Sequence, residues 1–429
     1  MTYRETLKYL FNRLPMYQRI GKAAYKDDLR NTLALDEHFG YSHRYFKSIH
    51  IAGTNGKGSV SHILASIFQS AGLKTGLYTS PHIKDFRERI KVNGVPVPEK
   101  FVIEFTRENK KIFESIEPSF FEMTVAMAFK YFAEQNVDIA IIETGMGGRL
   151  DSTNIITPMA SVITNIGTDH SEFLGISPKS IALEKAGIIK HKIPVIIGES
   201  HPETTEVFKT RAEEYNSRIV FAQNNYTCSS SPGKSVNSQF FQVKKGGKTV
   251  YRKLETDLMG SYQQKNAVTV IQTLDVLKRQ KIPIPKESIL KGFRNVIKNT
   301  GLLGRWQVLG KKPMTICDIA HNIEALREIT DQLSLTQKNR LHMVIGFNED
   351  KDVTPILEMM PRDAIYYFTK SSIPRAMSVD RLIKASLATG LNGSGFETVK
   401  DALQEARKNA SPSDLIFIGG STFVVSEIL

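Results

Sequence analysis

The sequence contains few cysteines and no long apolar run. Only Cys228 and Cys317 occur among the 429 residues, and they lie far apart in the chain. Two distant cysteines exclude a disulfide framework and give no metal-ligand spacing, which is typical of a protein from a reducing compartment. No uncharged run approaches the roughly 20 residues that a membrane helix needs, and charges interrupt the N-terminal stretch MTYRETLKYLFNRLP. We therefore expect a cytoplasmic protein without a signal peptide and without a membrane partner.

The chain also lacks a recognisable nucleic-acid motif, although its formal net charge is +13. Its densest basic stretch, KKGGKTVYRK from Lys244 to Lys253, flanks a Gly-Gly pair between two alternating runs and predicts a solvated hairpin. We therefore expect no nucleic-acid partner. The excess of positive charge fits anionic substrates such as nucleotides, phosphates and carboxylates.

The order of apolar runs predicts an α/β protein with two domains. From Ser48 onward, short β-branched runs alternate with helical patterns, and a second alternation runs from MTICDIA to DLIFIGG. Between them, IKNTGLLGRW has glycines and no helical period. We predict a phosphate-loop-type, mostly parallel sheet domain at residues 1–298 with a small β excursion at about 200–256, and a C-terminal Rossmann-like α/β domain at residues 299–429.

The most informative stretch is IHIAGTNGKGSV, in which a strand runs into a glycine-rich loop. At a strand-to-helix turn, glycines allow backbone N–H groups to approach an anion closely. Lys57 can reach terminal phosphates, and the Ser59 hydroxyl can bind magnesium. The match to the common phosphate-binding loop is imperfect because a glycine separates the lysine from the hydroxyl, so a connection without a ligand is the alternative. The predicted phosphate contacts are Gly53, Thr54, Asn55, Gly56, Lys57, Gly58 and Ser59, which we name the phosphate loop.

Three further polar residues follow predicted strands. Glu143 ends VDIAIIE, His170 follows ASVITNIGTD, and Lys185 lies in the helical pattern IALEKAGII. In an open α/β sheet, ligands bind beyond the carboxyl ends of the strands, so Ser59, Glu143 and His170 can converge. A cation bound to phosphate prefers the oxygen ligands that Glu143 and Ser59 provide. Taken singly, these residues have plainer interpretations: a loop carboxylate, a structural histidine and an exposed helical lysine.

The motifs together resemble one family. The chain contains, in order, GTNGKGS, YTSPHIKDFRERI, SFFE, ETGMGGRLDSTN, TNIGTDH with LEKAGI, GRW, DIAHN and GGSTF. This succession is similar to that of the folylpolyglutamate synthases, including the bifunctional form that is also a dihydrofolate synthase, within the Mur ligase superfamily. The resemblance implies that ATP phosphorylates a carboxylate of a folate or dihydropteroate, and that the amine of L-glutamate attacks the acyl phosphate. The chemistry agrees, because phosphorylation supplies the leaving group that a carboxylate lacks.

The resemblance also implies a metal site and a catalytic set. Lys57 would hold the β- and γ-phosphates. Ser80 and Glu143 would bind one Mg²⁺, and His170, Glu143 and Lys185 would serve a second. An ammonium beside a dication is repelled, but the matching lysine in this superfamily is commonly carbamylated by CO₂, which makes it an anionic ligand. K⁺ is a further candidate cofactor.

The remaining implied residues contact the substrates. Those that resemble ATP contacts and residues that close over the reacting phosphate are Asn266, Arg305, Asp318 and His321. Those that resemble contacts to the pterin or to the incoming glutamate are Ser119, Phe121, Asp151 and Ser421. Lys57, His170, Lys185 and His321 form the implied catalytic set. The structural alternatives are an interdomain salt bridge for Arg305, helix caps for Asp318 and Asn322, and a core position for Phe121.

Two other functions also agree with parts of the sequence. A peptidoglycan-precursor ligase uses the same chemistry but carries a sugar-nucleotide domain before the phosphate loop, whereas only 52 residues precede Gly53. A nucleotide switch or nucleic-acid ATPase would release phosphate without glutamate and bind nucleic acid in a salt-dependent way. We expect small-molecule partners only, a monomer, and a rotation of the two domains about residues 297–306 that closes ATP between them.

Overall fold

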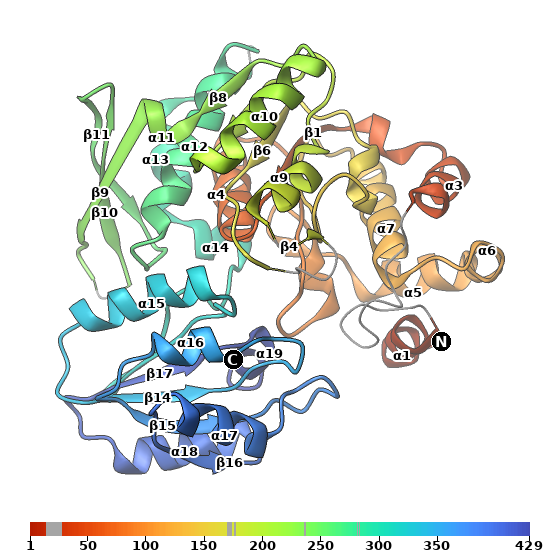
Figure 1. The fold of residues 1–429 in the computed structure, drawn as a ribbon. Helices are drawn as coiled ribbons and strands as arrows, with labels where there is room; N and C mark the ends of the chain where they lie inside the picture. The colour runs from red at the N-terminus through yellow and green to blue at the C-terminus, as the bar shows by residue number, and fades with distance from the viewer. Residues whose placement is uncertain (14–27, 170–173, 176, 236, 281, 283) are drawn as a thin grey trace. The chain divides into compact units, whose positions relative to one another are not determined.

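The computed structural model describes residues 1–13, 28–169, 174–175, 177–235, 237–280, 282 and 284–429. Two compact units make up the chain (Figure 1): unit 1 is Met1–Asp257 with Gln263–Gly301, and unit 2 is Leu258–Tyr262 with Leu302–Leu429. The sequence alone predicts Leu258–Tyr262, here named the crossing segment, in the first domain. It belongs instead to unit 2, because Met259 and Tyr262 pack against the core of that unit. In the described part of the chain, no helix has the length and apolar character needed to cross a bilayer.

Unit 1 is built on an eight-stranded sheet with the order β4-β3-β2-β5-β1-β6-β7-β8. Pairing is parallel from β2 across to β8, and only the edge pairs β2·β3 and β3·β4 are antiparallel. The predicted mostly parallel sheet is thus confirmed. Its strands are β1 (Lys47–Ala52), β2 (Thr75–Tyr78), β3 (Ile90–Val92), β4 (Val95–Pro96), β5 (Ile139–Glu143), β6 (Ala160–Ile163), β7 (Val195–Ile197) and β8 (Ile219–Phe221).

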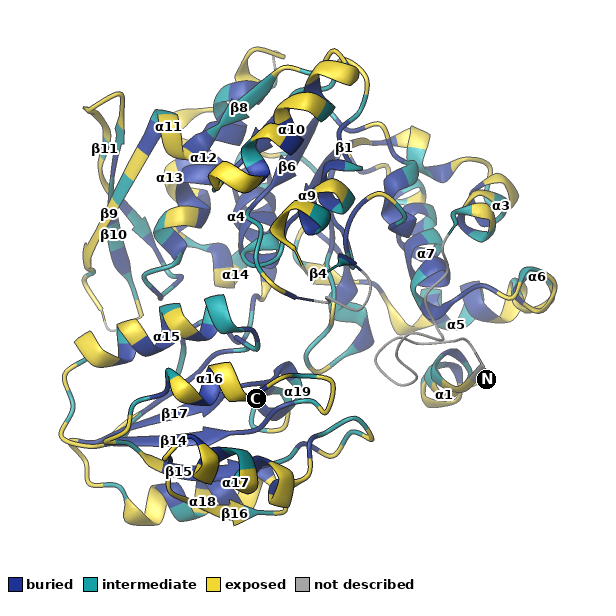
Figure 2. Cartoon of the chain, in the orientation of Figure 1, coloured by how far each residue is buried: buried dark blue, intermediate teal, exposed yellow. Residues whose placement is uncertain are grey.

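Helices pack against this sheet, whose central strands are buried (Figure 2). Ala140 and Ile142 of β5 share a core cluster with α7, and α4 packs against β1, β2 and β5. Such burial explains why the strands read as continuous apolar runs. The helices of unit 1 are α1 (Tyr3–Arg13), α3 (Arg30–His38), η2 (Ser42–Tyr45), α4 (Lys57–Ser70), η3 (Phe86–Arg89), α5 (Glu99–Glu108), α6 (Lys110–Ile116), α7 (Phe120–Glu134), η4 (Ser152–Ile155), α9 (Pro178–Ala186), α10 (Pro202–Glu214), α11 (Ala222–Asn225), α12 (Gln263–Lys278), α13 (Lys286–Arg294) and α14 (Val296–Thr300).

The β excursion is shorter than the sequence predicts. It is an antiparallel sheet of β9 (Tyr226–Pro232), β10 (Gln239–Lys245) and β11 (Lys248–Thr256), in the order β11-β10-β9. Residues 200–225 instead contribute α10, α11 and β8, because the apolar run Ile219–Phe221 extends the main sheet. The predicted hairpin is confirmed: β10 pairs with β11 through Gly246 and Gly247, both with positive φ.

Unit 2 is an α/β unit with the strand order β12-β13-β17-β14-β15-β16. Only β12 pairs antiparallel, so the expected Rossmann-like arrangement is confirmed. Its strands are β12 (Gln307–Lys311), β13 (Met314–Cys317), β14 (Leu341–Ile345), β15 (Ile365–Thr369), β16 (Gly393–Phe396) and β17 (Leu415–Gly419). Its helices are α15 (Ile323–Leu335), α16 (Thr354–Glu358), α17 (Val379–Ala388), α18 (Val399–Asn409) and α19 (Thr422–Ser426).

Candidate active site

Three of the predicted groups of unit 1 lie at one edge of its sheet. Strands β2, β5, β1 and β6 are neighbours and parallel, so their carboxyl ends meet at that edge. Ser80 follows β2, Glu143 ends β5, and the phosphate loop follows β1. The topology therefore brings three of the predicted groups to one edge.

Gly53 and Gly56 shape the phosphate loop. Gly53 has a φ of +148°, and a Cβ there would lie 1.8 Å from Thr164 Oγ1. Gly56 has a φ of +83°, and a Cβ there would lie 2.3 Å from Asn266 Oδ1. Among the described side chains, none caps the start of α4, which leaves the backbone N–H groups of its first turn to an incoming anion. The loop thus has the close approach and the donors that a phosphate requires.

The loop is held from the side of β6. Thr54 Oγ1 donates to the carbonyl oxygen of Gly167 over 3.0 Å, and the Asn55 amide donates to Asn165 Oδ1 over 2.9 Å. Thr164 Oγ1 donates to the carbonyl oxygen of Asn55 over 2.6 Å. The side chain of Thr54 therefore shapes the loop, and its predicted contact to ATP stays a prediction.

Two ammonium groups converge on one carbonyl of the loop. Lys57 Nζ donates to the carbonyl oxygens of Gly53 over 2.9 Å and of Thr54 over 3.1 Å. Lys185 Nζ donates to the same Gly53 oxygen over 2.8 Å. Protonated amines this close repel each other, which favours the uncharged form of one of them. Since Lys185 is only 3% exposed, its interpretation as an exposed helical lysine is wrong.

The surroundings of Lys185 change its protonation. Burial and, to a smaller extent, the charge of Lys57 lower the pKa of Lys185 from 10.5 to about 7, although Asp169 and Asp151 act in the opposite direction. Near neutral pH, much of this side chain is therefore the uncharged amine. An uncharged amine is a nucleophile, which an ammonium is not.

A buried polar network joins the phosphate loop to α12. Gln263 Nε2 donates to Ser59 Oγ over 3.2 Å, and Asn266 Nδ2 donates to Gln263 Oε1 over 2.8 Å. Asn266 in turn lies against Gly56. The structure thus brings the predicted residues Ser59 and Asn266 together through Gln263, which the sequence analysis missed. The available signal was the three-residue spacing of Gln263 and Asn266, which places both on one face of a helix.

Few of the described side chains at this edge of the sheet can act as metal ligands. Glu143 is only 4% exposed at the end of β5, and His170 lies outside the described residues. Within the described residues, no group of three or more His, Cys, Asp and Glu side chains could hold a metal ion. A Mg²⁺ ion that keeps several water and phosphate ligands needs only one or two carboxylates from the protein. Glu143 with the hydroxyls of Ser59 and Ser80 fits that requirement.

A buried arginine lies between the Ser80 loop and α7. Arg89 Nε donates to His82 Nδ1 over 2.7 Å, and its guanidinium lies 5.2 Å from the centre of the Phe120 ring. Burial lowers the pKa of Arg89, against the effects of Tyr78 and Glu143. Burial and Arg89 also lower the pKa of His82 to about 3, so His82 is neutral and accepts at Nδ1. The sequence analysis missed Arg89, although it is one of the two arginines in the quoted motif FRERI.

The predicted pterin contact Ser119 has a structural task. It is the N-cap of α7: Ser119 Oγ accepts from the Glu122 amide over 3.2 Å, and the Glu122 carboxylate accepts from the Ser119 amide over 2.6 Å. This capping box fixes where α7 begins. It thereby sets the direction of the neighbouring Phe121.

Asp151 organises the second glycine-rich loop. Its carboxylate accepts from the amides of Gly145 over 2.8 Å and of Met146 over 2.9 Å. Burial raises the pKa of Asp151, and these hydrogen bonds oppose the shift. The partly buried ring of Phe121 lies against the same loop, since a Cβ on Gly145 would lie 2.4 Å from it. The roles of Asp151 and Phe121 toward a substrate stay predictions.

Asp318 anchors the GRW turn of unit 2. Its Oδ2 accepts from the Trp306 amide over 2.7 Å and from the Tyr262 hydroxyl over 2.6 Å. Burial raises the pKa of Asp318, whereas the charge of Arg305 lowers it. Asp318 is therefore not a helix cap. Asn322 is the N-cap of α15, which confirms the helix cap proposed for this residue from the sequence.

The predicted residues of unit 2 also follow neighbouring strands. Asp318 and His321 follow β13, and Ser421 follows β17, its neighbour in the sheet. His321 Nδ1 contacts the Ile319 carbonyl oxygen at 2.9 Å, and Ser421 Oγ donates to Asn348 Oδ1 over 3.2 Å. Their contacts to ATP and glutamate stay predictions.

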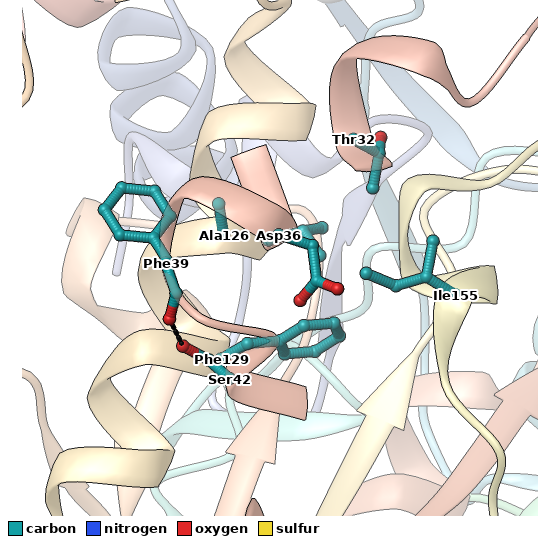
Figure 3. A pocket seen from close by; sticks show the side chains of 8 residues that line it. Thr32, Asp36, Phe39, Ser42, Ala126, Phe129 and Ile155 are labelled. Atoms are coloured by element: carbon teal, nitrogen blue, oxygen red, sulfur yellow. Dashed lines mark hydrogen bonds between the residues drawn. The ribbon is translucent and has the colours of Figure 1, made fainter. Parts of the chain in front are cut away.

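A small pocket lies elsewhere in unit 1, where Thr32 and Asp36 of α3 face Ile155 (Figure 3). Asp36 Oδ1 lies 2.9 Å from His43 Nδ1, and the other walls are mainly apolar. None of the predicted site residues lines this pocket. The case for a functional site therefore depends on the strand ends.

Comparison with known proteins gives matches over most of the chain. The family model "Mur ligase middle domain" matches residues 51–274, and "Mur ligase, glutamate ligase domain" matches residues 304–422. The chain is 30% identical to the dihydrofolate synthase/folylpolyglutamate synthase of Bacillus subtilis over 95% of each chain. It is 32% identical to the probable bifunctional folylpolyglutamate synthase/dihydropteroate synthase of Haloferax volcanii, matching all of this chain but spanning only 50% of that relative.

One similar solved structure contains a nucleotide analogue and a metal. It is the bifunctional folylpolyglutamate synthase/dihydrofolate synthase from Yersinia pestis, complexed with AMPPNP and a Mn ion. The TM-score is 0.84 at 25% sequence identity, and the match covers 100% of this chain and 97% of that one.

Proposed function

The chain belongs to the Mur ligase family, and we propose that it is an ATP-dependent ligase of folate metabolism. It joins L-glutamate to a folate and to dihydropteroate through an acyl phosphate. The observation that carries the proposal is the phosphate loop, where Lys57 and Lys185 converge on the carbonyl oxygen of Gly53 at the same sheet edge as Glu143. The names of the B. subtilis and Y. pestis relatives support the choice of substrate.

The side chains at this edge suit the chemistry. An acyl phosphate forms only if two anions, ATP and the substrate carboxylate, are held together. The amides at the start of α4 and the ammonium of Lys57 hold the phosphates, and Lys57 exchanges its loop carbonyls for phosphate oxygens. From unit 2, Arg305, Asp318 and His321 contact ATP, and Ser421 contacts glutamate. When bound, Mg²⁺ neutralises phosphate charge, and Ser59, Ser80 and Glu143 would hold it.

We also propose that Lys185 is carbamylated. Its uncharged amine attacks the carbon of CO₂, and a C–O π pair moves to oxygen. The nitrogen then loses a proton to water, and the product is an anionic carbamate. The lowered pKa of Lys185 supports this step, because the amine must first lose a proton. Bicarbonate should raise activity and add the mass of CO₂. Insensitivity to bicarbonate together with an active Lys185→Ala variant would overturn it.

One assay tests the function. The purified protein is given ATP, Mg²⁺ and labelled glutamate, with dihydropteroate or tetrahydrofolate as the acceptor. We expect phosphate release that depends on glutamate and label in both acceptors. Phosphate release without glutamate, together with salt-sensitive binding of RNA or DNA, would favour the nucleotide switch instead. Replacing K⁺ by Na⁺ in the same assay tests the proposed monovalent cofactor.

Two finer proposals concern the state of the protein. We propose that the protein acts as a monomer. We also propose that it acts in the cytoplasm, where cysteines such as Cys228 and Cys317 stay reduced. Light scattering of the active fraction tests the monomer. A mass of twice the chain mass would contradict it.

A further inference from the structure

Helix α14 is fastened to the phosphate-loop helix α4. His62 Nδ1 lies 2.7 Å from Thr300 Oγ1, and Asn299 Nδ2 donates to Ser66 Oγ over 3.0 Å. His62 and Ser66 are four residues apart on α4 and so share one face of it. Thr300 is the last residue of α14, and the chain enters unit 2 after the next residue. This exit from unit 1 is thus attached to the helix that begins at the phosphate loop.

A buried lysine is bonded to the same exit. Lys91 of β3 donates from Nζ to the carbonyl oxygen of Thr300 over 2.7 Å, and it is buried. A cation at the carbonyl end of a helix satisfies an acceptor that has no partner within the helix. The turn after β3 packs tightly there too, since a Cβ on Gly94 would lie 1.9 Å from the carbonyl oxygen of Asn299.

The other two connections are held as well. Asp257, the last residue before the crossing segment, accepts from the amides of Val296 over 3.0 Å and of Ile297 over 2.9 Å. These amides belong to the first turn of α14, where a helix lacks internal acceptors. Gln263, the first residue after the crossing segment, donates to Ser59. Each point where the chain changes units therefore lies within two residues of a bond to α4 or α14.

We propose that Asp257, Lys91 and His62 are positioning residues that fix the connections between the units to the phosphate-loop helix. When nucleotide binds to the phosphate loop, the crossing segment and residues 301–306 then become more ordered. The second of these connections includes Arg305. Because α14 belongs to unit 1, rotation of the units takes place within 258–262 and 301–306 and not at residues 297–300. The kinetic part of this inference rests on the proposed ligase function.

The test compares Asp257→Ala and Lys91→Met with the wild-type full chain. Hydrogen exchange of amides in the crossing segment and in residues 301–306 is measured with and without AMPPNP and Mg²⁺. In the wild type, AMPPNP should slow this exchange. In the variants we expect exchange about 10-fold faster and little effect of AMPPNP, with a Kd for ADP within about 2-fold of the wild type. The kcat for glutamate ligation should fall about 10-fold, with a smaller change in KM for ATP.

Matched controls separate positioning from simple stabilisation. Lys190 Nζ donates to the Asn154 carbonyl oxygen over 2.8 Å, and Asp138 Oδ2 accepts from the Lys74 amide over 2.7 Å, so Lys190→Met and Asp138→Ala remove similar bonds elsewhere. They should lower Tm without changing the response of the connections to AMPPNP. If Asp257→Ala does not fold, the Asp257→Asn variant is used in its place, because its side chain keeps one acceptor oxygen.

The outcomes are distinguishable. If Asp257→Ala and Lys91→Met lose Tm but keep kcat and the AMPPNP response, Asp257 and Lys91 are only structural and the proposal is wrong. If the wild type shows the exchange response but no glutamate ligation, the proposed function fails while the positioning role stands.

Discussion

The pKa of Lys185 affects stability as well as chemistry. The folded value is about 7 and the ordinary value is 10.5, so the unfolded state binds more protons between these pH values. Stability therefore rises as the pH rises from 7 to 10.5, and below pH 7 the full cost of a buried ammonium is present. Lys185→Met removes that cost but also leaves the Gly53 carbonyl oxygen without this donor.

We expect Lys185→Met to be inactive yet more stable than the wild type at pH 7 by roughly 1 to 3 kcal/mol in CO₂-free buffer. The advantage should shrink toward pH 10.5. Urea unfolding of both proteins at several pH values measures it. A difference in stability that does not depend on pH would contradict the assigned pKa.

Arg89 is expected to act through the loop that carries Ser80. Arg89→Lys keeps the charge but loses the Nε–H that bonds His82, so kcat/KM for ligation should fall about 10-fold. His82→Leu should do the same, and His82→Asn, which restores an acceptor, should recover part of the loss. Steady-state kinetics at varied Mg²⁺ measure the effect. Arg87→Lys is the control, because Arg87 pairs with Asp85 in a partly buried bond. Equal losses in both arginine variants would refute a specific role.

The sequence predicted the positions of those candidate residues whose signal is local. Lys57, Ser59 and Glu143 stand at a strand end or in a loop of recognisable composition, and the structure places them at one edge of the sheet. Gln263 could not be found this way, because its partner Ser59 is 204 positions away. The burial of Lys185 likewise follows from packing that no short motif encodes.

The backbone of the phosphate loop requires that position 53 carry no side chain. A Cβ at its φ of +148° would also meet Thr164 Oγ1 at 1.8 Å. Gly53→Ala should therefore weaken ATP binding at least 10-fold and destabilise unit 1 by about 2 to 4 kcal/mol. Calorimetric titration with AMPPNP and thermal unfolding measure both effects.

Two comparisons make the Gly53 prediction specific. Thr164→Ala in the Gly53→Ala background removes the clashing hydroxyl and should restore part of the binding. Gly72, which follows α4, has a φ of +84° with nothing within 4 Å of its Cβ position. Gly72→Ala should cost about 1 kcal/mol through the backbone alone and leave ATP binding unchanged. Equal effects of Gly53→Ala and Gly72→Ala would show that the clash with Thr164 is unimportant.

Elements were predictable where their apolar pattern was self-contained. The alternation of short apolar runs and helical patterns gave both parallel sheets and the Gly246-Gly247 hairpin. The limits of the β excursion were wrong because Ile219–Phe221 is too short to reveal which sheet it joins. The crossing segment was assigned to the wrong unit because its place is fixed by long-range bonds, such as that from the Ser261 amide to Gln332 Oε1 at 2.7 Å.

At the scale of the whole molecule, each unit has its own core, so nucleotide binding to one need not stabilise the other. Separate apolar clusters lie in unit 1 and in unit 2. A ligand at 100 times its Kd stabilises the unit that binds it by about 2.7 kcal/mol. Coupling through the connections depends on Asp257 and Lys91, which fix them to α14.

Calorimetry should therefore show how nucleotide binding spreads through the wild-type chain. AMPPNP with Mg²⁺ should raise the unfolding temperature of both units in the wild type, because the fixed connections transmit the ordering of the phosphate loop. In Asp257→Ala it should raise that of unit 1 alone, and the two transitions should separate. Asp138→Ala should behave as the wild type, since its bond lies away from the connections. If AMPPNP shifts both units of Asp257→Ala equally, coupling between the units does not pass through Asp257.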